Sequence, residues 1–121
     1  MGRQKSELRI LIIEDEYMIS MLLDQVLRDW GFRDVVIAHS LKEAFAAVNS
    51  RMPDFAFLDV MLHDRTTFDV ADLLASSGVP FIFLTAVSDG AMPAKWRDKP
   101  RLEKPVHFAE LNRLFSKILP I

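Results

Sequence analysis

The chain has no cysteine among its 121 residues, which excludes disulfides, thiolate zinc sites and cysteine nucleophiles. It also lacks an excess of positive charge: the formal net charge of -2 argues against a dedicated nucleic-acid binder. Its apolar runs are only a few residues long, far below the roughly 20 needed to span a bilayer. The polar start from Met1 to Glu7 has no signal-peptide core. These absences predict a cytoplasmic protein with no leader and no membrane segment.

What the chain does have is the composition of a folded domain, since half of its residues are hydrophobic and 26% are charged. Its length suits one domain with a single core. No internal repeat, low-complexity segment or linker interrupts it. We therefore predict one domain over residues 1–121, with its core at 8–119 and no output domain after the last helix.

Short apolar runs alternate with amphipathic segments along the chain, which predicts strands that alternate with helices. The strands are predicted at residues 8–13, 34–38, 54–58, 80–84 and 101–103. The helices are predicted at residues 16–30, 40–49, 68–77 and 107–119. Between residues 86 and 99, Gly90, Pro93 and Pro100 break the pattern, so that Ala91 to Arg97 supports at most a short helix. This order predicts an α/β fold of the flavodoxin type: a doubly wound, five-stranded parallel sheet in the order 2-1-3-4-5, with helices on both faces.

Polar groups follow four of the predicted strands at the point where each strand ends. These groups are the acidic run Glu14-Asp15-Glu16, Asp59, Thr85 and Lys104. The carboxyl ends of parallel strands lie along one edge, which is where open α/β sheets bind ligands. Carboxylates, a hydroxyl and an ammonium gathered there suit a divalent metal together with a phosphoryl group.

These residues, with the exception of Lys104, also have a plain structural interpretation. Acidic residues before a helix favour its dipole, Asp59 could cap a turn, and Thr85 could finish a β-branched strand. Their joint occurrence at matching strand ends favours a site. The three histidines share no metal-binding spacing. We expect His39 and His107, at predicted helix starts, to be structural or exposed; His63 could modulate access to Asp59, although a solvated loop residue is the simpler interpretation.

With these motifs in order, the chain resembles the receiver domain of bacterial two-component response regulators, from about Leu8 to Leu119. The stretches 80–85 and 100–105 look like the FAT GUY branch of receivers. As in that branch, the aromatic residue that most receivers carry three positions before the lysine is absent, and Arg101 stands there. Ala86-Val87 departs from the Gly-Tyr that the branch expects after its threonine.

The resemblance implies a role for each matching residue. Asp59 is expected to accept a phosphoryl group, and Glu14, Asp15, Asp59 and the Met61 backbone carbonyl are expected to hold Mg²⁺. Thr85 and Lys104 are expected to contact the phosphoryl oxygens, with a cis bond between Lys104 and Pro105. The expected phosphate donor is a histidine kinase or a histidine phosphotransfer protein.

The same resemblance implies a regulator and not a metabolic enzyme. We expect a single-domain response regulator, monomeric or weakly dimeric, without nucleic-acid or membrane partners. It would signal through an unidentified downstream protein or serve as a phosphate sink or shuttle. Because the switch aromatic is missing, we expect phosphorylation to act by ordering residues 86–99 through Thr85.

Two alternatives remain open. The first is a pseudo-receiver that binds a partner without being phosphorylated, against which the acidic set speaks. The second is a phosphohydrolase that forms an aspartyl-phosphate, as haloacid-dehalogenase-like enzymes do. Those enzymes usually carry a second aspartate two residues after the nucleophile, and this chain has Met61 there.

Overall fold

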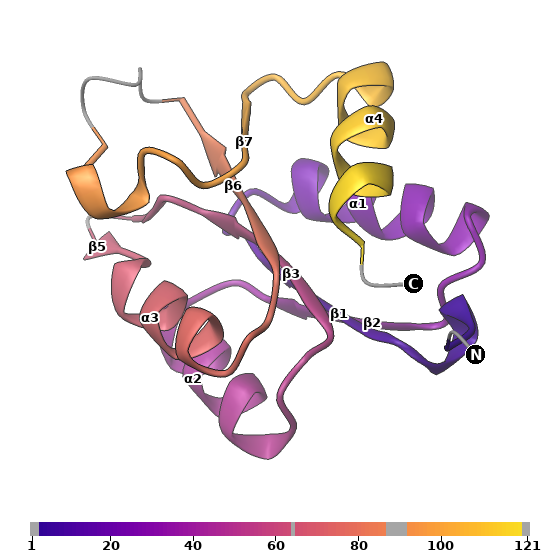
Figure 1. Ribbon diagram of the computed structural model, residues 1–121, viewed down its shortest axis with the longest axis horizontal. Helices are drawn as coiled ribbons and strands as arrows, with labels where there is room; N and C mark the ends of the chain where they lie inside the picture. The colour runs from indigo at the N-terminus through magenta and orange to yellow at the C-terminus, as the bar shows by residue number, and fades with distance from the viewer. Residues whose placement is uncertain (1–2, 64, 87–91, 120–121) are drawn as a thin grey trace.

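The computed structural model describes residues 3–63, 65–86 and 92–119, and its centre is one parallel sheet (Figure 1). The strands of this sheet are β1 (Arg9–Ile13), β2 (Asp34–Ala38), β3 (Phe55–Asp59), β6 (Phe81–Thr85) and β7 (Arg101–Glu103). Their spatial order is β2-β1-β3-β6-β7, and all four pairings are parallel. This is the predicted order 2-1-3-4-5, so the predicted fold class is confirmed.

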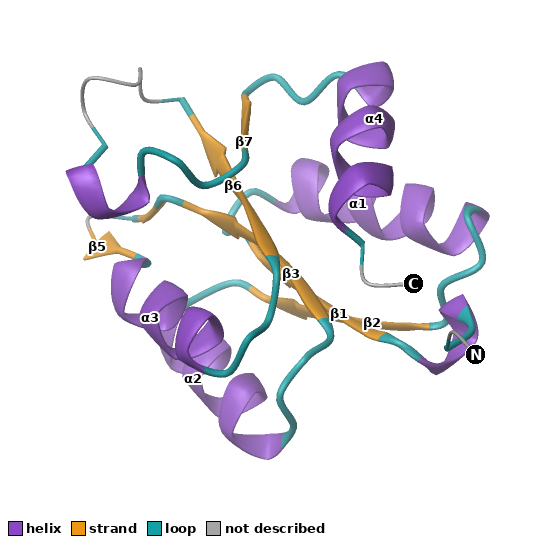
Figure 2. Cartoon of the chain, in the orientation of Figure 1, coloured by secondary structure: helices purple, strands orange, loops and turns teal. Residues whose placement is uncertain are grey.

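In the part of the chain that the structure describes, four α-helices cover the two faces of the sheet. They are α1 (Tyr17–Asp29), α2 (Leu41–Ser50), α3 (Phe68–Ser76) and α4 (Phe108–Ile118). Helices α1 and α4 lie on one face, and α2 and α3 lie on the other (Figures 1 and 2). Within the described residues, no helix is long and apolar enough to cross a bilayer.

The central strands are buried on both faces, which explains why they consist of uninterrupted apolar runs. Their side chains alternate between two hydrophobic clusters, one under each pair of helices. Phe55 and Phe57 point toward α4, where both rings contact Phe115. On the opposite face, Phe83 packs against Trp96 and Phe68. The two clusters fix the sheet between its helices and therefore fix the positions of the strand ends.

Two features differ from the sequence-based prediction or refine it. Strands β4 (Met61–Leu62) and β5 (Arg65–Thr66) form a small antiparallel hairpin directly after β3. With two residues each, these strands are too short to show a periodic pattern in the sequence. The short helix allowed between Ala91 and Arg97 is a 3-10 turn at Ala94–Trp96. Residues 87–91 of the segment expected to order on phosphorylation lie outside the described residues.

Candidate functional site

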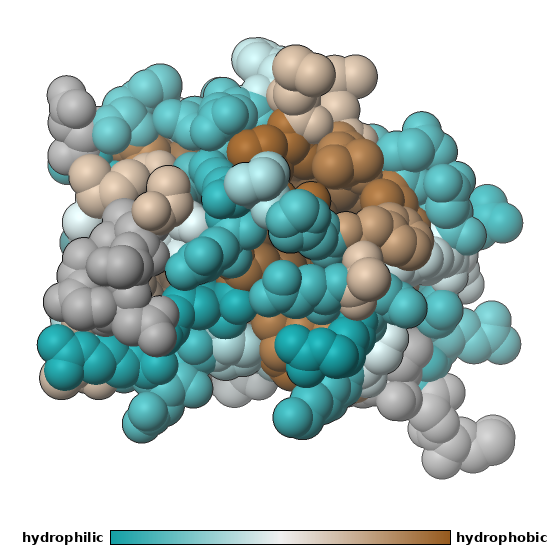
Figure 3. Space-filling model, turned by 90° about the horizontal axis from the view of Figure 1, so that it is seen from above, coloured by the Kyte–Doolittle hydropathy of each residue, from teal (hydrophilic) through white to brown (hydrophobic). Residues whose placement is uncertain are grey.

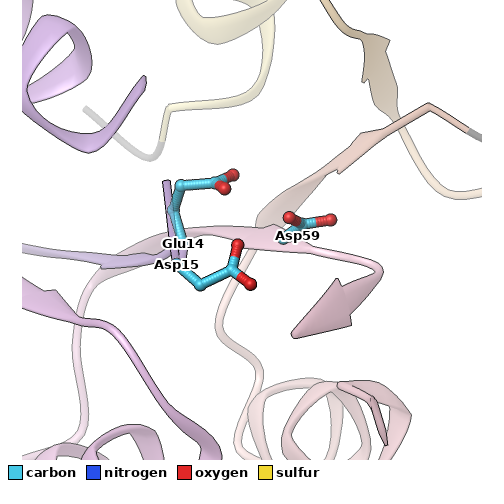
Figure 4. A group of neighbouring side chains, drawn as sticks. All are labelled: Glu14, Asp15 and Asp59. Atoms are coloured by element: carbon cyan, nitrogen blue, oxygen red, sulfur yellow. The ribbon is translucent and has the colours of Figure 1, made fainter. Parts of the chain in front are cut away.

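Three carboxylates meet at the carboxyl edge of the sheet (Figure 4). Glu14 and Asp15 directly follow β1, and Asp59 is the last residue of β3, which pairs with β1. One oxygen from each of the three carboxylates lies within 4.8 Å of the others. Glu14 and Asp59 are buried, and Asp15 is partly buried. The structure therefore brings the predicted acidic residues together.

The ammonium of Lys104 lies between these carboxylates. Its Nζ is 2.7 Å from Asp59 Oδ2 and 3.1 Å from Glu14 Oε1, and its side chain is only 14% exposed. The lysine follows β7, and its backbone N–H donates to the carbonyl of Thr85 at 2.9 Å, which extends the sheet by one residue. The Lys104–Pro105 bond is cis, as expected. Lys104 thus supplies the positive charge that lets two carboxylates share a buried site.

Burial and charge shift the pKa values of this group. Burial raises the pKa of Glu14 to about 7, the negative charge of Asp59 adds to this rise, and the Glu16 N–H and Lys104 offset part of it. Burial alone would lower the pKa of Lys104, but its hydrogen bond to Asp59 and the nearby carboxylate charges raise it overall. The lysine therefore stays charged at neutral pH, whereas Glu14 lies near its titration midpoint.

The second carboxylate oxygen of Glu14 indicates that the site suits a cation. Glu14 Oε2 is buried and has no hydrogen-bond partner within the described part of the chain. A buried oxygen without a partner is costly, and a cation bound beside it would satisfy it. Three carboxylates are the hard oxygen donors that Mg²⁺ prefers. The residues present therefore fit the predicted metal.

Comparison with known proteins identifies the family. Residues 10–114 match the family described as the response regulator receiver domain. The chain is a response regulator receiver domain.

Curated relatives agree with this assignment over part of their length. The DNA-binding response regulator MtrA of Mycobacterium tuberculosis is 40% identical over 82 residues, which are 67% of this chain and 36% of MtrA. The transcriptional regulatory protein PdtaR of the same species is 34% identical over 107 residues, which are 85% of this chain and 52% of PdtaR. This receiver domain therefore spans about a third to a half of these relatives.

Among solved structures, SdrG from Sphingomonas melonis Fr1 is similar over nearly its whole length. It has a TM-score of 0.81 and 31% identity, with 94% of this chain and 97% of SdrG covered. PhyR from Brucella abortus has a TM-score of 0.77 and 29% identity, with 93% of this chain and 47% of PhyR covered. These likenesses support the receiver fold, and the assignment to the FAT GUY branch stays a prediction.

The loop after Asp59 is held from two sides, by contacts that sequence reasoning missed. The Thr67 hydroxyl donates to the Asp59 carbonyl at 2.5 Å, and the Thr67 N–H donates to the Val60 carbonyl at 3.0 Å. On the other side, the His63 N–H donates to Asp15 Oδ2 at 3.1 Å. Threonine is a common residue at the start of a helix, where its side chain caps a free backbone N–H. Thr67 does precede α3, but its hydroxyl bonds the Asp59 loop and makes no cap hydrogen bond.

Thr85 and Met61, the remaining predicted site residues, lie at the same edge of the sheet, whereas Arg101 lies at the start of β7. Thr85 ends β6, the strand that pairs with β3, and is fully buried. Met61 begins the hairpin, and its N–H donates to Asp59 Oδ1 at 3.2 Å. Arg101 in β7 is partly buried and donates to the Arg97 carbonyl at 2.9 Å. Contact of Thr85 with a phosphoryl group and binding of a metal by the Met61 carbonyl stay predictions.

Proposed function

We propose that this receiver domain accepts a phosphoryl group from a phosphohistidine donor onto Asp59 and signals through contacts with other proteins. The observation that carries the proposal is the ammonium of Lys104, 2.7 Å from Asp59 Oδ2, within a group of three carboxylates. Asp59 suits the acceptor role better than Glu14 does. A nucleophilic carboxylate must be ionised and reachable. Glu14 has no exposed surface and burial raises its pKa to about 7, whereas Asp59 keeps an exposed fraction of 6%.

In the proposed reaction, an oxygen of Asp59 attacks the phosphorus of the donor. A P–O bond forms as the P–N bond breaks, and the bonding electron pair stays on the imidazole nitrogen. The Met61 N–H and Lys104 each hold one oxygen of the carboxylate, which orients it before attack.

The other residues supply charge around the reacting atoms. Glu14, Asp15, Asp59 and the Met61 carbonyl would hold Mg²⁺, which when bound screens the repulsion between the carboxylate and the phosphoryl oxygens. Lys104 contributes a second positive charge at the same place. After transfer, Lys104 and Thr85 would each contact a phosphoryl oxygen of the product.

An exposed apolar surface beside the site supports a protein as the phosphate donor. On α1, Met18 is 85% exposed, Met21 is 64% exposed and Leu22 is 50% exposed. They line a groove of about 920 Å³ together with Val106 and with Lys104, which contacts Asp59. Figure 3 shows apolar side chains gathered on the face seen from above. We infer that the donor, a histidine kinase or histidine phosphotransfer protein, covers this surface when its phosphohistidine reaches Asp59.

Intact-mass measurement after incubation with acetyl phosphate and Mg²⁺ tests the proposal. We expect one added phosphate on the wild-type protein and none on Asp59→Asn, which keeps the shape of the side chain but loses its charge. An equal adduct on Asp59→Asn would place the acceptor elsewhere. No adduct on the wild type would support a pseudo-receiver, and rapid multiple turnover of acetyl phosphate would support a phosphohydrolase.

The consequences of phosphorylation for other proteins belong to the same proposal. We propose that the phosphorylated domain contacts a downstream protein or passes its phosphate on, as a monomer or weak homodimer. A pull-down that compares the beryllofluoride-bound form with the unmodified form would identify a partner that distinguishes the two. The cytoplasmic location stays a prediction, which cell fractionation would test.

A further inference from the structure

His39 connects three segments around the acidic pair, a position that its expected structural or exposed role did not anticipate. Its ring Nδ1 lies 3.0 Å from the backbone carbonyl of Glu14. Its backbone N–H donates to Glu43 Oε1 in the first turn of α2 at 2.9 Å. Its ring lies against that of Tyr17, the first residue of α1, in a tilted arrangement with 4.3 Å between ring centroids. The His39 ring thus joins the loop after β1 to the start of α1, and the His39 backbone joins the same residue to the start of α2.

The contact with Glu14 extends the sheet where its backbone ladder ends. The Glu14 N–H donates to the Ala38 carbonyl at 3.0 Å, which continues the pairing of β1 with β2. In a continuing parallel ladder, the Glu14 carbonyl would next accept from the backbone N–H of residue 40. However, β2 ends at Ala38, and Ser40 is already the N-cap of α2. The His39 ring therefore takes the place of the next backbone donor.

The chemistry of this contact indicates which nitrogen of the ring carries a hydrogen. A backbone carbonyl oxygen accepts hydrogen bonds and cannot donate them, so Nδ1 must carry the hydrogen. The bonded carbonyl belongs to the peptide that joins Glu14 to Asp15, and both side chains face Asp59 across the site. Rotation of that peptide would turn the two carboxylates relative to each other. Partners of this kind, which orient a metal ligand without touching the metal, commonly change metal affinity by 10- to 100-fold.

We propose that His39 is a positioning residue for the metal site: it donates from Nδ1 to the Glu14 carbonyl and holds Glu14 and Asp15 in the arrangement that binds Mg²⁺. This proposal rests on the proposed function, because it assumes that the acidic site binds Mg²⁺. It predicts that the hydrogen on the ring nitrogen matters, and that the aromatic ring itself does not.

Two amide variants separate these contributions. In His39→Asn the amide nitrogen occupies nearly the place of Nδ1, whereas in His39→Gln it lies one bond further out. Both are polar and of similar size, so both should fold, as urea unfolding in EDTA would check. By calorimetry, we expect His39→Gln to bind Mg²⁺ about 10-fold more weakly than the wild type. We expect His39→Asn to bind close to the wild-type value, and Tyr17→Phe, which keeps an aromatic ring against His39, to bind unchanged.

Nitrogen NMR of the metal-free wild type tests the hydrogen bond directly. We expect His39 to carry its hydrogen on Nδ1 when neutral; a ring with hydrogen on Nε2 alone would overturn the proposal. Equal Mg²⁺ affinity in the Asn and Gln variants would also overturn it, and so would a wild type that binds no Mg²⁺. If Nδ1 carries the hydrogen and the affinities differ as expected, but Asp59 takes no phosphate, the proposed function fails and the role of His39 stands.

Discussion

The Thr67 hydroxyl donates a hydrogen bond to the backbone carbonyl of Asp59 from eight residues further along the chain. Both residues are buried, so no water can replace this donor easily. Together with the Thr67 N–H, which bonds the Val60 carbonyl, it closes the loop that carries the acceptor. The position of the Asp59 carboxylate therefore depends on a residue at the start of α3.

Thr67→Val keeps the shape of the side chain but removes the donor. We expect it to lower the free energy of unfolding by about 1–3 kcal/mol, because it leaves a buried carbonyl without its partner. We also expect slower phosphorylation by acetyl phosphate, because the carboxylate is less well oriented. Urea unfolding and intact-mass time courses would measure both effects. Thr67→Ser keeps the hydroxyl and should phosphorylate at nearly the wild-type rate; a Ser variant as slow as Val would argue against this hydrogen bond.

The fold was predictable from the sequence because its strands are apolar runs that end abruptly in polar residues. Boundaries differ by a residue or two: the first helix was expected at residues 16–30 and spans Tyr17–Asp29. Because parallel strands align their carboxyl ends, the same pattern predicted that Glu14, Asp15, Asp59 and Lys104 would meet.

The supporting contacts were not predictable in this way. His39 and Thr67 act through hydrogen bonds to backbone carbonyls, and such contacts leave no periodic signal in one sequence. His39 and Glu14 are 25 positions apart in the sequence, and the pairing of β1 with β2 brings them together. The hairpin at residues 61–66 was also missed, since its strands are too short for alternation to appear. Sequence reasoning thus placed the charged groups but not the residues that orient them.

Lys104 is expected to matter for stability as well as for phosphorylation. Lys104→Met leaves the carboxylates of Glu14 and Asp59 close together without a compensating charge, which should cost about 3–5 kcal/mol of unfolding free energy. Saturating Mg²⁺ should restore part of this loss. The matched control is Lys95→Met, because Lys95 pairs with Asp72 in an exposed position and its loss should cost less than about 1 kcal/mol. Equal losses in the two variants, measured by urea unfolding, would contradict the electrostatic account.

The raised pKa of Glu14 predicts how stability depends on pH. In the folded protein the pKa is about 7, compared with 4.5 ordinarily. Between these values the folded state keeps a proton that the unfolded state has lost. The free energy of unfolding should therefore fall as pH rises through this window, by up to about 3 kcal/mol, and the loss should be complete above pH 7. Urea titrations in EDTA from pH 5 to pH 8 would measure the decline.

Glu14→Gln provides the control for this pH dependence. It cannot titrate, so its unfolding free energy should be nearly level over the same range. Added Mg²⁺ should stabilise the wild type most at pH 8, where Glu14 is ionised, and least at pH 5, where a proton competes with the metal. A decline of the same size in Glu14→Gln would assign the pH dependence to another group.

Variants of the exposed α1 surface can distinguish the docking of a protein donor from the phosphoryl-transfer chemistry at Asp59. We expect the double variant Met18→Gln and Met21→Gln to slow phosphorylation by a phosphorylated kinase or phosphotransfer protein by about 10-fold or more, since it removes two exposed apolar side chains from the inferred interface. Its reaction with acetyl phosphate should be unchanged, because that small donor needs no docking surface. The control is Leu73→Gln, an exposed apolar side chain on α3, across the sheet from α1. If the α1 variant slowed both donors equally, the methionines would be acting on the site itself; if Leu73→Gln slowed the protein donor as much, the contact would not be specific to α1.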